Sequence, residues 1–482
     1  MKGDPPGTDI EMDLHMGRRL DAVEIRHLLE EARARTVSLL SSVSEADQRI
    51  QHDPLMSPVL WDLGHIAHFE EVWLVENLGG STNGAEGLRG MYNPVENPRR
   101  TRAELPLPGV AECFEYMSGV RQAVLERLAT LDLTTEDPLL DHGFVFRMVL
   151  QHEYQHNETI LQTLQLKGGE PYHPAESVPH PVRPEDHPPE HDPPEHDPPE
   201  HHPPGHHPPE HHPPEHHSLG EGTMVRFPGG VVAIGTDDRS ASYDNERPLH
   251  SVELAPFLID VMPVTEAAYA VFIAEGGYET RALWSDEGWA WRTESGVRHP
   301  KYWRSGEEGW EIRVMDRILP PDSGRPVCHV CYHEAEAYAS FAGKRLPTEF
   351  EWEAAATWDP ATGTQRTYPW GEEPPTQAFA NVDVLTFGPA PAGTYVSNVS
   401  PIGCYGMIGD VWEWTSTNFQ AYPGYETFPY AEYSEVFFGD EYKVLRGGAW
   451  ATRGAAIRGT FRNWDYPIRR HIFSGFRCAR DL

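Results

Sequence analysis

Two histidines four residues apart are the sharpest chemical feature of this sequence. His152 and His156 belong to the string HEYQH, inside a segment whose apolar residues recur every three or four positions. Residues four apart share one face of a helix, so both imidazoles can point at one metal ion. The string also fits HExxH, the zinc peptidase pattern in which Glu153 would be the general base. The pair therefore predicts a metal site, and peptide hydrolysis is one hypothesis for its use.

A third ligand is available upstream, in the string WDLGHIAH. It contains His65 and His68, and either imidazole could complete the site from another helix. The residues after Asn157 lack the GxxH continuation found in a large group of zinc peptidases, which weakens the peptidase hypothesis. Three neutral imidazoles leave coordination positions open and suit iron, copper or zinc, so spacing alone does not name the metal.

The elements that must position these histidines are helices. Within residues 21–170, four amphipathic segments repeat apolar residues at intervals of three and four, at 23–43, 57–78, 109–131 and 142–166. They predict a four-helix bundle, a fold that builds metal sites from side chains on facing helices. Residues 1–20 are expected to form a disordered tail.

The amino-acid composition of the chain changes twice after the helical segments. Residues 171–218 repeat HDPPE and HHPPE units, and such proline density predicts an extended linker whose histidines could bind divalent metal loosely. Residues 219–482 carry short apolar runs broken by Gly, Pro and Asp, with many Trp and Tyr. This half predicts a mixed α/β fold with much irregular loop. The whole chain is expected to be an α+β multidomain protein.

Composition and charge exclude several classes of partner. The 482 residues include 39 Lys and Arg but 74 Asp and Glu. The resulting net charge of -35 disfavours binding to nucleic acid and to anionic membranes. The chain has no apolar run long enough for a membrane helix and no N-terminal signal-peptide pattern, so we expect a cytoplasmic protein. Five cysteines, few and odd in number, predict free thiols. We expect a monomer or a small homo-oligomer.

Several strings resemble known families. The first half resembles a DinB-like bundle, while PGGVVAIGT, DNERPLH, RLPTEFEWEAAA, GDVWEWT and GFRCAR resemble the formylglycine-generating, or sulfatase-modifying, enzymes with their C-type-lectin-like fold. Those enzymes use a cysteine pair, whereas Cys478 stands alone in GFRCAR, which argues against formylglycine generation. The order of the two domains, with HxxxH in the first and RNWDYPIRR in the second, resembles the hercynine oxygenases (EgtB, ergothioneine sulfoxide synthases).

This resemblance implies an activity and a cofactor. It implies an Fe(II) enzyme that uses dioxygen to join the sulfur of γ-glutamylcysteine to the imidazole of hercynine, giving the sulfoxide. The implied iron ligands are His65, His152 and His156. Related enzymes imply two further hypotheses for the donor, namely cysteine, as in ovothiol synthases, or a selenosugar, as in selenoneine synthases.

The resemblance also implies a role for each matching residue around the iron. Residues expected to hold hercynine are Gln155, Asn463 and Trp464. Residues expected to hold the thiol substrate are Arg99 and Arg102, which would grip its carboxylates, and Asp465, which would face its amino group. The expected catalytic residues are Tyr430, which would supply a proton during the oxygen chemistry, and its neighbour Tyr433.

Overall fold

The computed structural model describes residues 17–81, 86–94, 96–174, 222–307 and 309–482. Most of the predicted tail (1–20) and of the predicted linker (171–218) lies outside these ranges. The parts of both segments that are described contact the bundle: Leu20 and Tyr172 are buried, and the Tyr172 hydroxyl donates to the Leu39 carbonyl at 2.9 Å.

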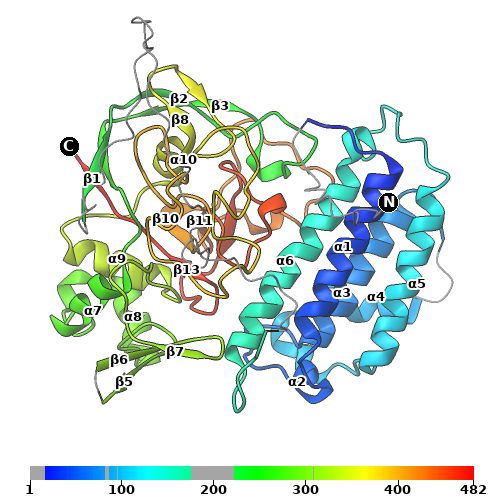
Figure 1. Ribbon diagram of the computed structural model, residues 1–482, viewed down its shortest axis with the longest axis horizontal. Helices are drawn as coiled ribbons and strands as arrows, with labels where there is room; N and C mark the ends of the chain where they lie inside the picture. The colour runs from blue at the N-terminus through cyan, green and yellow to red at the C-terminus, as the bar shows by residue number, and fades with distance from the viewer. Residues whose placement is uncertain (1–16, 82–85, 95, 175–221, 308) are drawn as a thin grey trace, which may run out of the picture.

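The first half is a helical bundle in which α1, α3, α5 and α6 run side by side (Figure 1). Its helices are α1 (Ala22–Leu40), α2 (Glu45–Arg49), α3 (Val59–Glu71), α4 (Glu86–Tyr92), α5 (Val110–Leu128) and α6 (Phe144–Leu166), with shorter turns η1 (Val72–Glu76), η2 (Arg99–Glu104) and η3 (Asp141–Gly143). Helix α6 packs against both α1 and α3. The prediction of a helical bundle from apolar periodicity is confirmed.

Local sequence explains where the main helices begin and how closely they pack. Asp21 caps α1, since its carboxylate accepts from two backbone amides while the Glu24 carboxylate accepts from the Asp21 amide. On α3, a Cβ at Gly64 would lie 2.0 Å from the Tyr92 ring, so only glycine lets that ring pack there. This close approach places the Tyr92 backbone beside His65.

The second half contains several small sheets joined by long loops. The sheets are β1–β4–β14 (Met224–Phe227, Phe257–Asp260, Ala479–Asp481), β12–β11–β10–β13 (Asn463–Asp465, Lys443–Arg446, Trp412–Asn418, Ser474–Gly475), β2–β3 (Gly230–Ile234, His250–Leu254), β5–β6–β7 (Trp303–Gly306, Gly309–Val314, Arg317–Leu319) and β8–β9 (Trp358–Asp359, Thr364–Gln365). The helices that accompany them are α7 (Glu266–Ala274), α8 (Asp286–Ser295), α9 (Tyr332–Phe341) and α10 (Glu349–Thr357). Among the strands of the described residues, β10 pairs with β13 in parallel and the other pairings are antiparallel. The predicted mixed α/β fold is confirmed.

Helix α6 lies at the boundary between the two halves (Figure 1). Glu158 on this helix is buried, and its carboxylate accepts from the Trp412 indole at 2.7 Å and from the Thr452 hydroxyl at 2.6 Å. Burial raises the pKa of Glu158. Both donors are neutral groups of the second half, so one buried carboxylate joins the two halves through α6.

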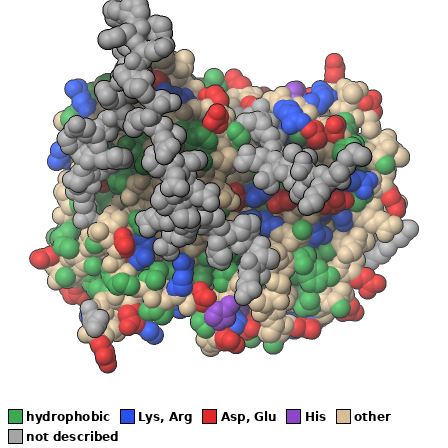
Figure 2. Space-filling model, viewed as in Figure 1, with side chains coloured by type: hydrophobic (Ala, Val, Ile, Leu, Met, Phe, Trp, Pro, Cys, Tyr) green, Lys and Arg blue, Asp and Glu red, His purple; other side chains and the backbone are tan. Residues whose placement is uncertain are grey.

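Charged and apolar side chains are mixed on the visible face of the molecule (Figure 2). Figure 2 shows acidic and basic side chains interspersed on that face, with smaller hydrophobic areas between them. Among the described residues, no helix is both long enough and apolar enough to cross a bilayer.

Candidate metal centre

The structure brings three histidines together inside the bundle. His65 comes from α3, and His152 and His156 come from successive turns of α6. Their candidate ligand nitrogens all lie within 4.8 Å of one another. His68, which the sequence left as an alternative to His65, is not part of this group. Of the two upstream histidines, therefore, His65 is the one placed to join the α6 pair.

The surroundings of His65 and His152 favour the neutral form, which is the form that binds metal ions. Burial, assisted by the charge of nearby His156, lowers the pKa of His65 and of His152 well below the ordinary histidine value. A neutral imidazole keeps a lone pair for a metal, whereas a protonated one does not. His65 and His152 can therefore each offer a lone pair to a metal at neutral pH.

Each imidazole has a distinct neighbour. The Nδ1 atom of His65 lies 2.9 Å from the Tyr92 carbonyl, which orients Nε2 as the free ligand atom. The Nδ1 atom of His156 lies 3.3 Å from an Asp62 carboxylate oxygen. His152 stacks on Phe69, with ring centroids 3.8 Å apart and an interplanar angle of 11°. An oriented set of three nitrogens fits a divalent first-row transition metal and leaves open positions.

Glu153 faces away from the histidines and into the bundle. Its side chain is 1% exposed, and its carboxylate binds Arg33 at 3.0 Å, Thr36 at 2.7 Å and Arg121 at 3.5 Å. Although burial alone would raise it, the charges of the two arginines lower the pKa of Glu153. A carboxylate engaged in this way cannot serve as a general base beside the metal. The peptidase hypothesis is therefore wrong for this site.

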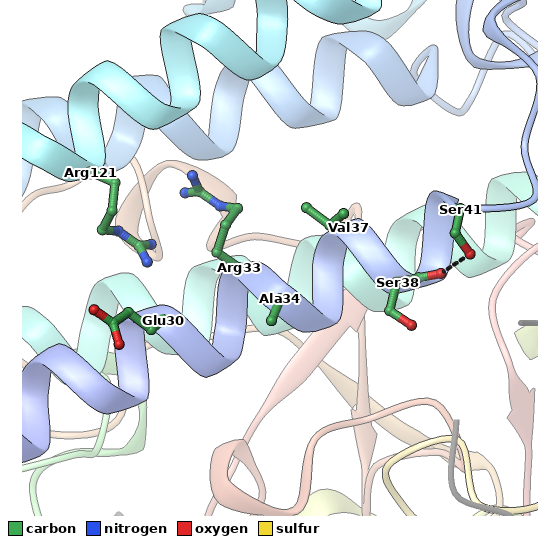
Figure 3. Close-up of a pocket in the computed structure, with 7 residues that line it drawn as sticks. All are labelled: Glu30, Arg33, Ala34, Val37, Ser38, Ser41 and Arg121. Atoms are coloured by element: carbon green, nitrogen blue, oxygen red, sulfur yellow. Dashed lines mark hydrogen bonds between the residues drawn. The ribbon is translucent and has the colours of Figure 1, made fainter. Parts of the chain in front are cut away.

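The arginines that hold Glu153 also line a groove on the outer face of the bundle. Arg33 on α1 and Arg121 on α5 both line this groove, which has a volume of about 570 Å³. Figure 3 shows their side chains extending into the space between the two helices. Both guanidinium groups also bind Glu70 of α3, at 2.6 Å and 2.5 Å. The buried ion pairs thus connect the four helices that support the histidines.

The two arginines predicted to bind the thiol substrate differ in their surroundings. Arg102 is buried, donates to Ser57 Oγ at 2.6 Å, and lies 3.3 Å over the Trp61 ring. Trp61 stacks in turn on His65, with ring centroids 4.7 Å apart. The Trp61 ring therefore lies between Arg102 and a candidate ligand. Burial lowers the pKa of Arg102 to about 9. Arg99 is exposed on the same short turn.

Asp465 approaches this turn from the second half. It lies at the end of β12, and its carboxylate is 3.3 Å from the guanidinium of Arg469. Arg469 reaches the bundle, donating to the Leu55 carbonyl at 2.8 Å. Burial lowers the pKa of Arg469, and the positive charge of Arg99 lowers it further. Residues from both halves thus form a positively charged region in which Asp465 and Asp53 are the acidic groups that act on Arg469.

The predicted catalytic tyrosines lie between the metal centre and β12. Tyr430 packs on Trp73 and Phe69, with ring centroids 5.1 Å and 6.0 Å away, and Phe69 is the residue that stacks on His152. Burial raises the pKa of Tyr430 well above the ordinary tyrosine value, so its hydroxyl keeps its proton at neutral pH.

The residues predicted to hold hercynine are connected to one another through Tyr433. Gln155 Nε2 donates to the Tyr433 hydroxyl at 3.2 Å, and the Trp464 ring meets the Tyr433 ring edge-on at 5.7 Å. Trp464 also stacks on Phe419 at 4.1 Å. The side-chain oxygen of Asn463 accepts from the Trp464 amide at 2.9 Å.

Several residues of the site were not predicted from the sequence. Asp62, three residues before His65, carries a recognisable signal, since that spacing places a carboxylate on the same helical face as the ligand. No such signal marks Phe69, Trp73 and Tyr243, because aromatic residues at such positions ordinarily pack in the hydrophobic core. Tyr243 comes from the second half, yet its hydroxyl accepts from Gln155 Nε2 at 3.2 Å.

Comparison with known proteins covers both halves. Residues 28–160 match the DinB superfamily, and residues 210–482 match the sulfatase-modifying factor enzyme 1-like domain. The chain is 42% identical to a hercynine oxygenase of Mycobacterium tuberculosis, covering 94% of this chain and 98% of the relative. It is 41% identical to a hercynine oxygenase of Mycolicibacterium thermoresistibile, covering 95% of each. A formylglycine-generating enzyme of Thermomonospora curvata is 31% identical over 54% of this chain and 93% of its own.

Proposed function

Because the chain belongs to the hercynine oxygenase family, we propose that it uses Fe(II) and dioxygen to join γ-glutamylcysteine to hercynine as a sulfoxide. Enzymes of this family are oxidoreductases, and the reaction belongs to ergothioneine biosynthesis. The observation that carries the proposal is the group of three close histidine ligand atoms, with Tyr430 packed on the Phe69 ring that stacks on His152, and with Gln155 bonded to Tyr433 of the second half.

The proposed reaction balances with dioxygen as the only oxidant. The thiol S–H bond and one imidazole C–H bond break, and a C–S bond and an S–O bond form. Dioxygen accepts four electrons: one oxygen atom becomes the sulfoxide oxygen, and the other leaves as water with the two released protons. Iron held by His65, His152 and His156 would supply the binding and redox activation of dioxygen.

The protein's own residues would bind and orient the two organic substrates. We assign hercynine to the region of Gln155, Asn463 and Trp464, next to the histidines. The arginines of η2 would bind the carboxylates of γ-glutamylcysteine, and Asp465 would bind its amino group. Holding the sulfur and the ring carbon in adjacent positions supplies much of the acceleration.

Anaerobic reconstitution tests this function directly. The protein is loaded with Fe(II), mixed with hercynine and γ-glutamylcysteine, and then exposed to air, and the products are identified by mass spectrometry. We expect the mass of the sulfoxide, with no product when iron, hercynine or air is omitted. Parallel reactions with cysteine and with a selenosugar test the other two donors, and a faster reaction with either would reassign the donor.

Removing Arg99 is expected to weaken binding of the thiol substrate selectively. For Arg99→Ala we expect the KM for γ-glutamylcysteine to rise about 10- to 100-fold, because a charged hydrogen-bonding contact to a carboxylate is lost. The KM for hercynine should change less than about twofold. Steady-state kinetics with each substrate varied in turn measure both values. Arg100→Ala, the exposed neighbour, is the matched control, and equal effects in both variants would contradict the assignment.

Replacing Glu153 is expected to affect stability rather than chemistry. In Glu153→Gln, the buried arginines lose part of their charge compensation, which should lower the free energy of unfolding by about 3 kcal/mol. Sulfoxide formation per folded molecule should stay within about threefold of the wild-type value. Urea unfolding and the mass-spectrometric assay measure the two effects, with Glu115→Gln on the exposed face of α5 as control. Complete loss of activity with unchanged stability would restore a catalytic role for Glu153.

A further inference from the structure

Residues 243–245 form an anchor in the second half of the protein, and no sequence motif assigns a role to Tyr243. The Tyr243 amide donates to a Glu246 carboxylate oxygen at 2.9 Å, and the Glu246 carboxylate also binds Arg458. The side chain of Tyr243 is 4% exposed and packs edge-on against Phe461 at 5.9 Å. The position of the Tyr243 ring is therefore set by the second half of the protein, not by the helix that it contacts.

The same anchor holds the loop that carries the two predicted catalytic tyrosines. The Asp244 carboxylate accepts from the Tyr425 hydroxyl at 2.7 Å, from the Phe428 amide at 3.2 Å and from the Ser434 hydroxyl. Asn245 donates to the Ser434 hydroxyl at 3.0 Å. Residues on both sides of Tyr430 are thus fixed to residues 243–245.

The hydroxyl of Tyr243 reaches across to α6 and shares a partner with Tyr433. The two rings stack with centroids 4.1 Å apart and an interplanar angle of 16°, which places both hydroxyls on the same side. Gln155 Nε2 lies 3.2 Å from each hydroxyl, so both of its N–H groups have acceptors. Within the described residues, no hydrogen bond engages the Gln155 Oε1 atom.

The two hydroxyls hold the Gln155 amide in one place. Its nitrogen faces both phenolic oxygens, which act here as acceptors. In this orientation Oε1 is left available to a ligand, and it can accept a hydrogen bond from an N–H group.

We propose that Tyr243 is a positioning residue for the imidazole substrate: with Tyr433 it fixes the Gln155 amide so that Oε1 accepts a hydrogen bond from the ring N–H. This inference rests on the proposed function, in which hercynine occupies the region of Gln155. Among the described residues, the Tyr243 side chain bonds Gln155 and packs on Tyr433 and Phe461, none of which is assigned to the thiol substrate. It therefore affects recognition of one substrate and not of the other.

Binding of hercynine to the Fe(II)-loaded enzyme, kept free of oxygen, tests the inference by calorimetry. We expect Tyr243→Phe, which keeps the stacked ring, to weaken hercynine binding about five- to tenfold, the effect of one hydrogen bond. Binding of γ-glutamylcysteine should stay within about twofold. In air, the KM for hercynine should rise by the same factor while kcat changes less. Iron content and the unfolding midpoint show whether the metal site and the fold are intact.

Two further variants separate positioning of Gln155 from general support of the tyrosine loop. Tyr425→Phe removes a hydroxyl from the same anchor without touching Gln155, and an equal loss of hercynine affinity there would overturn the inference. Gln155→Leu combined with Tyr243→Phe should bind hercynine no more weakly than Gln155→Leu alone. Additive losses would also overturn the inference. If the wild-type enzyme itself does not bind hercynine, the proposed function fails, and the inference with it.

Discussion

His152→Ala abolishes sulfoxide formation, with an expected loss of at least about a thousandfold. Variants of groups that only support a metal ligand typically cost 10- to 100-fold, and removing a ligand should exceed that range. The remaining two nitrogens cannot define a three-nitrogen site, so bound iron should fall as well. Metal analysis of the purified protein and mass spectrometry of the reaction mixture measure both losses.

His68→Ala is the matched control for this prediction. His68 lies on α3, three residues after His65, but outside the group of three close ligand atoms. The variant should keep most of its iron and activity, whereas His65→Ala should lose both. The reverse result, with iron lost on removal of His68 and kept without His65, would contradict the ligand assignment.

Tyr430→Phe should redirect the reaction from C–S bond formation to oxidation of the thiol itself. The Tyr430 hydroxyl is a protonated group near the metal centre, packed on the residue that stacks on His152. Removing a positioned proton donor typically costs 10²- to 10⁴-fold, so we expect sulfoxide formation to slow about a hundredfold. Dioxygen consumption should continue, because the histidines remain. An oxygen electrode and product analysis together give the partition between the two outcomes.

Tyr442→Phe provides the comparison, since it removes a surface hydroxyl that donates to Tyr466 at 2.8 Å. It should leave both the rate and the product ratio at wild-type values. If Tyr430→Phe also leaves the product ratio unchanged, Tyr430 is not the proton source. Tyr433 would then be tested next in the same way.

The sequence predicts those parts of the site that depend on one helix. His152 and His156 follow from helical periodicity, because four residues make slightly more than one turn. The choice between His65 and His68 does not, since residues three apart differ by only about 60° around the helix. Which of the two faces α6 depends on the rotation of α3, and that rotation is set by packing such as Gly64 against Tyr92.

Contacts between the two halves are beyond sequence reasoning. Tyr243 and Gln155 are 88 positions apart, and nothing near Tyr243 in the sequence indicates a helical partner. The environment of Arg102 is a similar case. The sequence predicts a solvated charge for an arginine in a short turn, whereas in the structure Arg102 stacks on the Trp61 ring. The resemblance to hercynine oxygenases predicts roles for Arg102 and Tyr430, but it does not predict the residues that pack against them.

The buried Glu158 joint has an evolutionary consequence. The candidate metal ligands belong to the first half, the predicted substrate contacts come from both halves, and the joint links the halves through uncharged donors on β10 and on one loop. Arg99 and Arg102 lie on η2 and Asp465 lies on β12, so none of the predicted thiol contacts is on the two helices that carry the histidines. New donor preferences can therefore arise by substitution outside α3 and α6.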